Sequence, residues 1–146
     1  MNMNREIKFR GKRAGENTWI YGYLREVFGN DKRTFMIAPA KTFGFDGVTD
    51  TEEDYVEADT VSQFTGLYDK NGKDIYEGDI LRSVKFHDIV GYVMYDKKEG
   101  AFMFIKIDEL MKTELETRCH ITERRLNEFP KEVIGNIYDN KELLEE

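Results

Sequence analysis

The sequence holds few of the residues that usually perform catalysis or cross-link a chain. Only one cysteine and two histidines occur among its 146 residues. Cys119 alone cannot form an intrachain disulfide, and a chain without disulfides suits a reducing cytoplasm. Cys119 and His120 are sequence neighbours, so in a strand they would point to opposite faces and not form a catalytic pair. His87 lies in an expected turn, and no nucleophile elbow, phosphate loop or metal-ligand spacing is present. We therefore predict no catalytic residue, no metal site and no cofactor.

Long hydrophobic runs and an excess of positive charge are also missing. No apolar run approaches the length that crosses a membrane, and the first 13 residues lack the apolar core of a signal peptide. Lys and Arg number 22 against 29 Asp and Glu, which gives a net charge of −7. Nucleic-acid binding by the whole surface is therefore disfavoured, because phosphates need concentrated positive charge. We expect a soluble cytoplasmic protein that contacts no membrane.

Strand-forming residues are abundant. Aromatic residues make up 13% of the chain, and turn signals recur about every 8–12 residues, a spacing typical of barrels and sandwiches. We expect a mainly β fold of about nine or ten short antiparallel strands with little helix. The expected strands are 5–13, 19–24, 34–38, 55–64, 67–68, 75–76, 80–86, 89–95, 101–107 and 133–138.

Two segments are predicted to contain a short helix or an irregular turn. Residues 108–129 fit a helical face in their first part and a period of two around Cys119, so we favour a short helix or irregular turn followed by a strand. Residues 141–146 form a short C-terminal helix that Asp139 or Asn140 would cap. Within the strand at 89–95, Gly91 is expected at a bulge or kink.

The stretch 66–82 combines two turn signals. Asn71 and Gly72 tolerate the positive φ of a tight hairpin turn, and Gly78 with Asp79 forms a second turn in which the Asp79 carboxylate would bond backbone N–H groups just downstream. Asp69 followed two residues later by Asn71 suggests a calcium loop. That pattern requires an oxygen ligand at its fifth position and glycine at its sixth, and this stretch has neither, so we reject it.

Charge is segregated in the first half of the chain. Residues 46–59 contain seven carboxylates and no Lys or Arg, which predicts a solvated acidic loop. We divide the chain into an N-terminal β region, residues 1–65, that includes this loop, and a C-terminal domain, residues 66–146.

The N-terminal strand carries the candidate interaction residues, which combine positive charge with aromatic rings. They are Lys8, Arg10, Lys12, Arg13, Trp19 and Tyr21. In one interpretation the cations form an outer face that grips phosphates while the rings stack on bases. In the other, which we favour, the basic face pairs with the acidic loop of the same or a neighbouring chain. Aromatic side chains on such a surface also commonly anchor protein partners.

Several blocks of the sequence resemble the YopX family of phage and prophage proteins. The matching residues are 5–10 with Trp19 and 21–22, then 63–67, 69–73 and 75–79, and finally 132–138 with Asn140 and 143–144. The resemblance implies a mostly β protein whose C-terminal part folds as an SH3-type barrel. It brings no established activity, cofactor or catalytic residue.

We therefore expect a phage or prophage accessory protein in the bacterial host cytoplasm that acts by binding and not by catalysis. Its partner would be an unknown host or phage protein, or a second copy of the chain. Nucleic acid bound through the basic strand is the first alternative, and an enzyme of unknown type is the least favoured.

Overall fold

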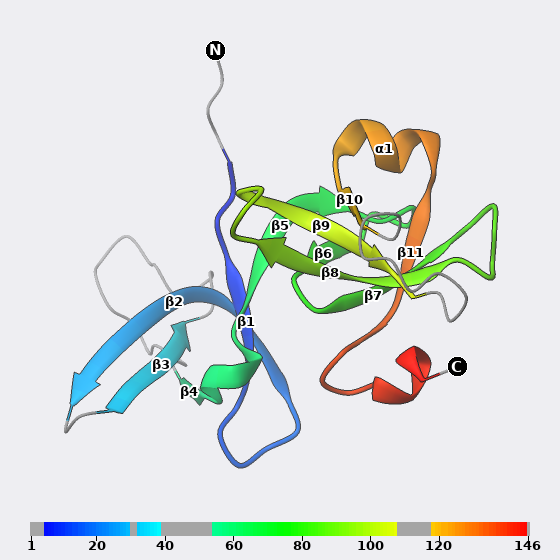
Figure 1. Ribbon diagram of the computed structural model, residues 1–146. Helices are drawn as coiled ribbons and strands as arrows, with labels where there is room; N and C mark the ends of the chain where they lie inside the picture. The colour runs from blue at the N-terminus through cyan, green and yellow to red at the C-terminus, as the bar shows by residue number, and fades with distance from the viewer. Residues whose placement is uncertain (1–4, 30–31, 39–53, 108–117, 146) are drawn as a thin grey trace. The chain divides into compact units, whose positions relative to one another are not determined.

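The chain folds mainly as antiparallel strands, as expected, with one short α-helix (Figure 1). The computed structural model describes residues 5–29, 32–38, 54–107 and 118–145. It divides into two compact units, residues 1–64 and 65–146. None of the helices in these described ranges is long and apolar enough to span a membrane.

The first unit is built on one antiparallel sheet. Its strands are β1 (Phe9–Lys12), β2 (Trp19–Gly29), β3 (Lys32–Ala38), β4 (Asp54–Val56) and the start of β5 (Ser62–Tyr68), and a 3₁₀ turn, η1 (Ala58–Thr60), precedes β5. The strand order in this unit is β4-β3-β2-β1-β5.

One face of this sheet is the core of the first unit. Ile20, Ile37 and Val56 are buried there and pack together, with Phe9 and Leu24 against them. Gly11 allows this packing, because a Cβ at this position would lie 2.8 Å from the Val56 Cβ. Alternating residues of β1 and β2 therefore leave the opposite face to the charged and aromatic side chains.

The single strand expected over residues 55–64 is wrong. β4 ends at Val56, η1 intervenes, and a separate β5 begins at Ser62. The Thr60 hydroxyl accepts the Lys12 N–H at 2.9 Å and donates to the Glu57 carbonyl at 2.7 Å. The local bond to Glu57 and the long-range bond to Lys12 together fix a turn that alternation along the strand does not reveal. The acidic stretch 46–53 lies outside the described residues.

The second unit holds a five-stranded sheet. After the end of β5 and the short β6 (Asp74–Tyr76) come β7 (Asp79–Ser83), β8 (Val90–Asp96), β9 (Ala101–Lys106), β10 (Arg118–His120), α1 (Glu123–Glu128), β11 (Lys131–Asn136) and the 3₁₀ turn η2 (Lys141–Leu144). The sheet order is β10-β9-β8-β7-β11, so α1 leads the chain from one edge strand to the other (Figure 1). The sequence of β8 and of β9 carries apolar side chains on both faces, which predicts central strands, and the sheet order confirms that both are interior.

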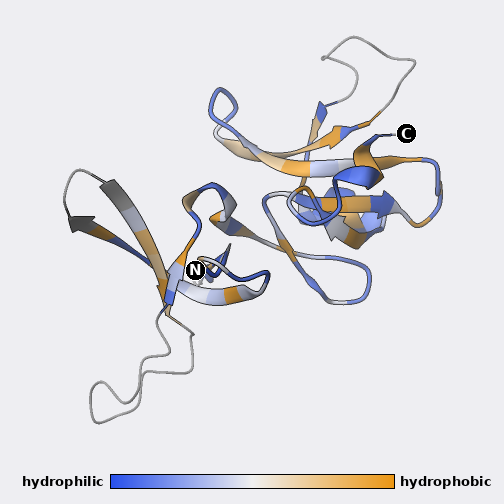
Figure 2. Ribbon diagram, turned by 90° about the horizontal axis from the view of Figure 1, so that it is seen from below, coloured by the Kyte–Doolittle hydropathy of each residue, from blue (hydrophilic) through white to orange (hydrophobic). Residues whose placement is uncertain are grey.

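The core of the second unit gathers side chains from most of its strands. Ile75, Leu81, Val93 and Phe104 are all at most 4% exposed and form one cluster. Leu126 packs against this cluster and so attaches α1 to the sheet. In Figure 2 the hydrophobic residues lie mainly on the strands, which also carry hydrophilic residues, and the loops are mostly hydrophilic.

The bulge expected at Gly91 is wrong. Gly91 pairs in regular register with Leu81 on one side and Lys106 on the other. The glycine is needed because the Phe104 ring occupies the space that a Cβ would take. The register shift in this sheet falls in β11 instead, between Val133 and Gly135.

The strand expected around Cys119 is confirmed as β10. The helix α1, which the sequence interpretation missed, follows it. The Thr122 hydroxyl begins α1 by accepting the Arg125 N–H at 3.1 Å. A helix before the strand would fall on residues 108–117, outside the described part. The C-terminal helix is the 3₁₀ turn η2, and Asn140 does not cap it with its side chain.

The Gly78 turn, which joins β6 to β7, yields a stability prediction. Gly78 has φ of 82°, and a Cβ there would lie 3.0 Å from the Tyr138 ring. We expect Gly78→Val to lower the free energy of unfolding by about 2–4 kcal/mol, through both backbone strain and this contact. Gly72→Ala is the control, because Gly72 has φ of 80° with no atom near its absent Cβ, so only strain of about 1 kcal/mol is expected. Chemical denaturation measures both, and equal losses would show that the Tyr138 contact is unimportant.

Candidate interaction site

The strand register brings four of the six predicted basic and aromatic residues to one face of the first unit. β1 and β2 run antiparallel, with Lys12 opposite Trp19 and Arg10 opposite Tyr21. Since side chains alternate along a strand, these four share the face opposite the core.

Most of these cations contact groups within the protein. The Arg10 guanidinium carbon lies 4.8 Å and the Lys12 ammonium 5.7 Å from the centre of the Trp19 ring. Lys12 also donates to the Asn17 side-chain oxygen at 2.7 Å. Lys8 lies 4.5 Å from the centre of the Phe64 ring. Arg10 and Lys12 therefore both form cation–π contacts with the Trp19 ring.

The expectation of a basic outer face is wrong for Arg10, which is only 5% exposed. Burial beside Trp19 makes its charge part of the packing, because a desolvated guanidinium interacts favourably with an indole ring. Arg13 forms an ion pair with Asp54, whose carboxylate oxygen is 3.5 Å from the Arg13 Nε. This is a contact of the kind expected between the basic strand and the acidic stretch, formed at a residue of that stretch that the structure describes.

Three tyrosines that point away from the core are the open part of this face. Tyr21, Tyr23 and Tyr55 are 48%, 47% and 48% exposed. Met36 of β3 pairs with both Arg25 of β2 and Tyr55 of β4, so Tyr55 lies on the same side of the sheet as the alternating β2 tyrosines. We call Tyr21, Tyr23 and Tyr55 the tyrosine face.

The sequence singled out only Tyr21 of these three residues as an interaction candidate. The alternation of Tyr21 and Tyr23 was a signal that the pair shares a face. Tyr55 gave no such signal, because the pairing of β4 with β3 depends on residues far apart in the chain.

In the second unit, the Asp69 carboxylate connects two segments of the chain. It is 8% exposed, and its Oδ1 accepts the N–H groups of Asn71 at 2.8 Å and Lys73 at 2.9 Å. Its Oδ2 accepts the N–H of Val133 in β11 at 3.0 Å. The Asp69 carboxylate, which in the sequence suggested a calcium ligand, therefore accepts hydrogen bonds from backbone N–H groups. In the described ranges, no group of three or more His, Cys, Asp or Glu side chains is arranged to hold a metal.

The second predicted turn differs in detail from the expectation. The Asp79 carboxylate is 2% exposed and accepts the N–H of Tyr76 at 2.8 Å, which lies upstream and not downstream. The backbone of Gly78 bonds in two directions, donating to Val93 at 2.7 Å and accepting from Ile137 at 2.8 Å. The turn is thus stabilised by its own Asp79 carboxylate, and the backbone of Gly78 links it to β8 and to the residue that follows β11.

A second asparagine-centred turn follows β11. The Asn140 side-chain oxygen accepts the Asn136 N–H at 3.1 Å, and the Asn136 side-chain oxygen accepts from Tyr138 and Asp139. Gly135 makes room for Asn140, since a Cβ there would lie 2.5 Å from its side-chain oxygen.

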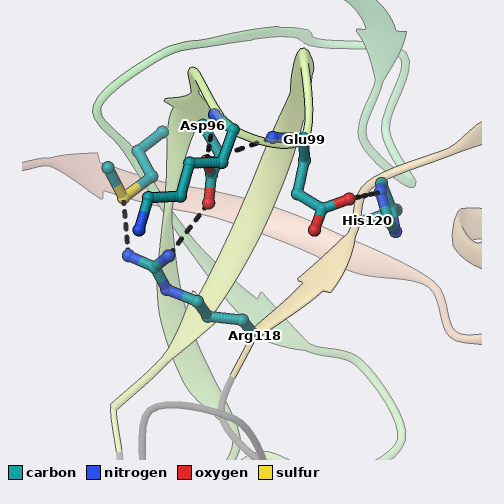
Figure 3. A network of polar contacts seen from close by, with 6 residues as sticks. Asp96, Glu99, Arg118 and His120 are labelled. Atoms are coloured by element: carbon teal, nitrogen blue, oxygen red, sulfur yellow. Dashed lines mark hydrogen bonds and ion pairs between the residues drawn. The ribbon is translucent and has the colours of Figure 1, made fainter.

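Charged residues at the β8–β9 hairpin form the polar network of Figure 3. The Asp96 carboxylate accepts the N–H groups of Lys98 and Glu99 and forms an ion pair with Arg118 at 2.9 Å. His120 lies 3.4 Å from the Glu99 carboxylate. His120 is half exposed while its neighbour Cys119 packs against the core, so these two side chains do point to different environments.

The Asp69 contacts yield a second stability prediction. Asp69→Asn keeps the shape but replaces one accepting oxygen with an N–H group facing backbone donors. We expect the free energy of unfolding to fall by about 2–3 kcal/mol, since bonds to a charged acceptor are strong. Asp88→Asn, at an exposed turn position, removes the same charge and should change stability by less than about 0.5 kcal/mol. Urea unfolding of both variants gives the comparison; similar small effects would mean that Asp69 does not hold the turn to β11.

The hairpin network yields a pH dependence. The hydrogen bond from the Lys98 backbone, with that from Glu99 and the charge of Arg118, lowers the pKa of Asp96 below 3.8 despite an opposing effect of burial. A lowered folded-state pKa stabilises the fold above the unfolded-state value, and this contribution is lost as the pH falls through the folded-state pKa. We expect Asp96→Asn to lower the melting temperature at pH 7, and the difference from the parent protein to shrink below about pH 3.8. A difference that stays constant with pH would contradict this assignment.

Comparison with known proteins places the chain in a family. A search of curated proteins finds no match. The family model described as YopX protein matches residues 8–145, nearly the whole chain. The match includes the candidate basic strand, the Asp69 and Gly78 turns and the turn after β11. The chain therefore belongs to the YopX family.

Proposed function

We propose that this protein is a non-catalytic accessory protein that acts by binding another protein through the tyrosine face. The observation that carries the proposal is the exposure of three tyrosines, each close to half, on one side of one small sheet. Tyrosine supplies a large apolar surface and a hydroxyl, and it loses little conformational entropy on binding. Aromatic side chains are enriched at protein interfaces for these reasons.

The contacts of the cations favour a protein partner over nucleic acid. Phosphate binding requires Lys and Arg side chains that are available to the backbone of the nucleic acid. Here Arg10 is buried beside Trp19, Lys12 bonds to Asn17, and Arg13 is paired with Asp54. Single-stranded nucleic acid, stacked on the tyrosines, is the second candidate, because aromatic rings can also support bases.

The proposal also covers the origin of the protein and its cellular location. The family resemblance favours a phage or prophage origin and a role in the cytoplasm of the bacterial host. The partner is then a host or phage protein, with self-association as a further possibility. Light scattering at several salt concentrations distinguishes self-association from a monomer that binds a different protein.

We further propose that residues 65–146 form an SH3-type barrel. Support comes from the order of the strands: β7 to β10 follow one another as antiparallel neighbours, and β11 returns to pair with β7. A short helical segment precedes that return. Contacts between β10 and β11 in an NMR structure of the chain would establish closure, and an open sheet with separated edges would contradict it.

The binding proposal is tested by removing two members of the tyrosine face. We expect the Tyr21→Ser, Tyr55→Ser double variant to remain folded and to recover its host or phage partner at least about tenfold less well in a quantitative pull-down, since interface aromatics contribute strongly. Tyr68→Ser, at a 51% exposed tyrosine of the second unit, is the matched control.

Recovery of the partner by the double variant is compared with recovery by Tyr68→Ser. Equal recovery by the double variant and the control would remove the tyrosine face from the interface. A polarisation titration with single-stranded oligonucleotide at low and high salt runs in parallel. Tight binding at low salt that the double variant loses would support the nucleic-acid candidate in place of the protein one.

A further inference from the structure

The second unit contains a cavity that neither the strand pattern nor the family match assigns to a function. It has a volume of about 240 Å³. The core residue Phe104 and the partly buried Ile89 and Cys119 line its apolar part, together with Phe86 and Phe129. Both of these phenylalanines are unusually open for their type, 51% and 47% exposed. The cavity therefore offers an apolar interior and aromatic side chains that water can reach.

The charged side chains that line the cavity all carry the same sign. They are Lys106 of β9, Arg118 of β10, Arg125 of α1 and Lys131 of β11. Among the described lining residues there is no carboxylate. This concentration is notable in a chain whose net charge is −7. Since four separate elements each supply one cation, the gathering of positive charge at the cavity is a product of the fold.

The surroundings orient two of these cations. Arg118 is held by its ion pair with Asp96 at 2.9 Å (Figure 3). Lys131 lies 5.0 Å from the centre of the Phe104 ring and donates to the Phe129 carbonyl at 3.2 Å. Burial lowers the pKa of Lys131 below 10.5; Cys119 acts in the opposite sense, and the charge of Arg125 lowers the pKa further. An anion placed between Lys131 and Arg125 would relieve both the burial cost and their mutual repulsion.

The size and chemistry of the cavity limit its ligand. Sites for drug-sized molecules usually exceed about 300 Å³, so this cavity suits a smaller molecule of about one ring. Apolar walls favour an aromatic or aliphatic body, and the cations favour a carboxylate at one end. We propose that the cavity bounded by Phe104, Arg125 and Lys131 is a binding site for a small organic acid with an apolar body. The proposal is independent of the tyrosine face.

The experiment titrates the full chain with 3-phenylpropionate and follows amide chemical shifts. We expect saturable shifts centred on Phe104, Cys119 and Arg125. The neutral amide of the same acid should bind about tenfold more weakly, because one charge-assisted contact is lost. Equal affinity for the acid and its amide, or no saturable shift with either, would overturn the proposal.

Two neighbouring arginines of α1 provide a matched pair of variants. Arg125→Gln should weaken binding of 3-phenylpropionate about tenfold. Arg124→Gln makes the same charge change one residue away, at a side chain that is 90% exposed and outside the cavity, and should leave the affinity within about twofold. If both variants weaken binding equally, the effect comes from net charge and the site is wrong.

Lys131→Met tests the second cation, since methionine keeps an apolar stem against Phe104 while removing the charge. It should also weaken binding of the acid about tenfold, and leave binding of the neutral amide nearly unchanged. Weakening of both ligands to the same extent would mean that the variant had altered the cavity wall and that the Lys131 charge does not bind the acid.

Cys119 supplies a second readout because it is the chain's only cysteine and lines the cavity. We expect saturating 3-phenylpropionate to slow the reaction of Cys119 with a neutral maleimide at least about fivefold, in proportion to the occupied fraction of the site. An unchanged rate at ligand concentrations that saturate the amide shifts would place the ligand elsewhere and overturn the assignment.

Discussion

The carboxylate of Asp69 is the interaction on which the second unit depends most. It accepts two N–H groups from its own hairpin turn and one from Val133, 64 residues further along the chain. A buried carboxylate is costly unless hydrogen bonds satisfy it. Here one group both forms a tight turn and positions β11, whose pairing with β7 completes the sheet. The cavity depends on the same placement, because Lys131 begins β11 and Lys70 donates its N–H to the Lys131 carbonyl at 2.9 Å.

The sequence blocks from residue 69 onward that resemble the YopX family contain residues that shape the turns and strand packing of the second unit, and few residues of a binding site. Gly78 adopts a positive φ against Tyr138, Gly135 makes room for Asn140, and Asn136 closes the turn after β11. Each of these residues satisfies backbone or permits a close approach, tasks that few other residue types perform. The family pattern therefore reports how the chain folds. The tyrosine face and the cationic cavity draw most of their residues from outside these blocks.

The two units use positive charge in different ways. In the first, Arg10 and Lys12 lie against Trp19 and Arg13 is paired with Asp54, so cations that look like a nucleic-acid surface in the sequence mainly support the sheet. In the second, Arg125 and Lys131 come from separate elements and line one cavity. A cluster of basic residues in the sequence is thus a poor guide to available charge, because long side chains often pack along neighbouring rings. The cations that line the cavity are instead contributed by separate elements that the fold brings together.

The sequence by itself determined the elements whose causes are local. Apolar side chains on both faces identified the interior strands β8 and β9, and Gly72 and Gly78 marked turns because their positive φ angles suit glycine. Tertiary structure decided what depends on distant partners. The contact of Thr60 with Lys12 divides the strand expected at 55–64. The Phe104 ring packs against Gly91, where a bulge was expected. Arg10, expected on an outer face, is buried. The tertiary structure also placed Tyr55 on the same side of the sheet as the β2 tyrosines, and Arg125 and Lys131 at one cavity. Local propensity acts over a few residues, whereas burial and electrostatic potential are set by side chains that meet only after the sheets have formed.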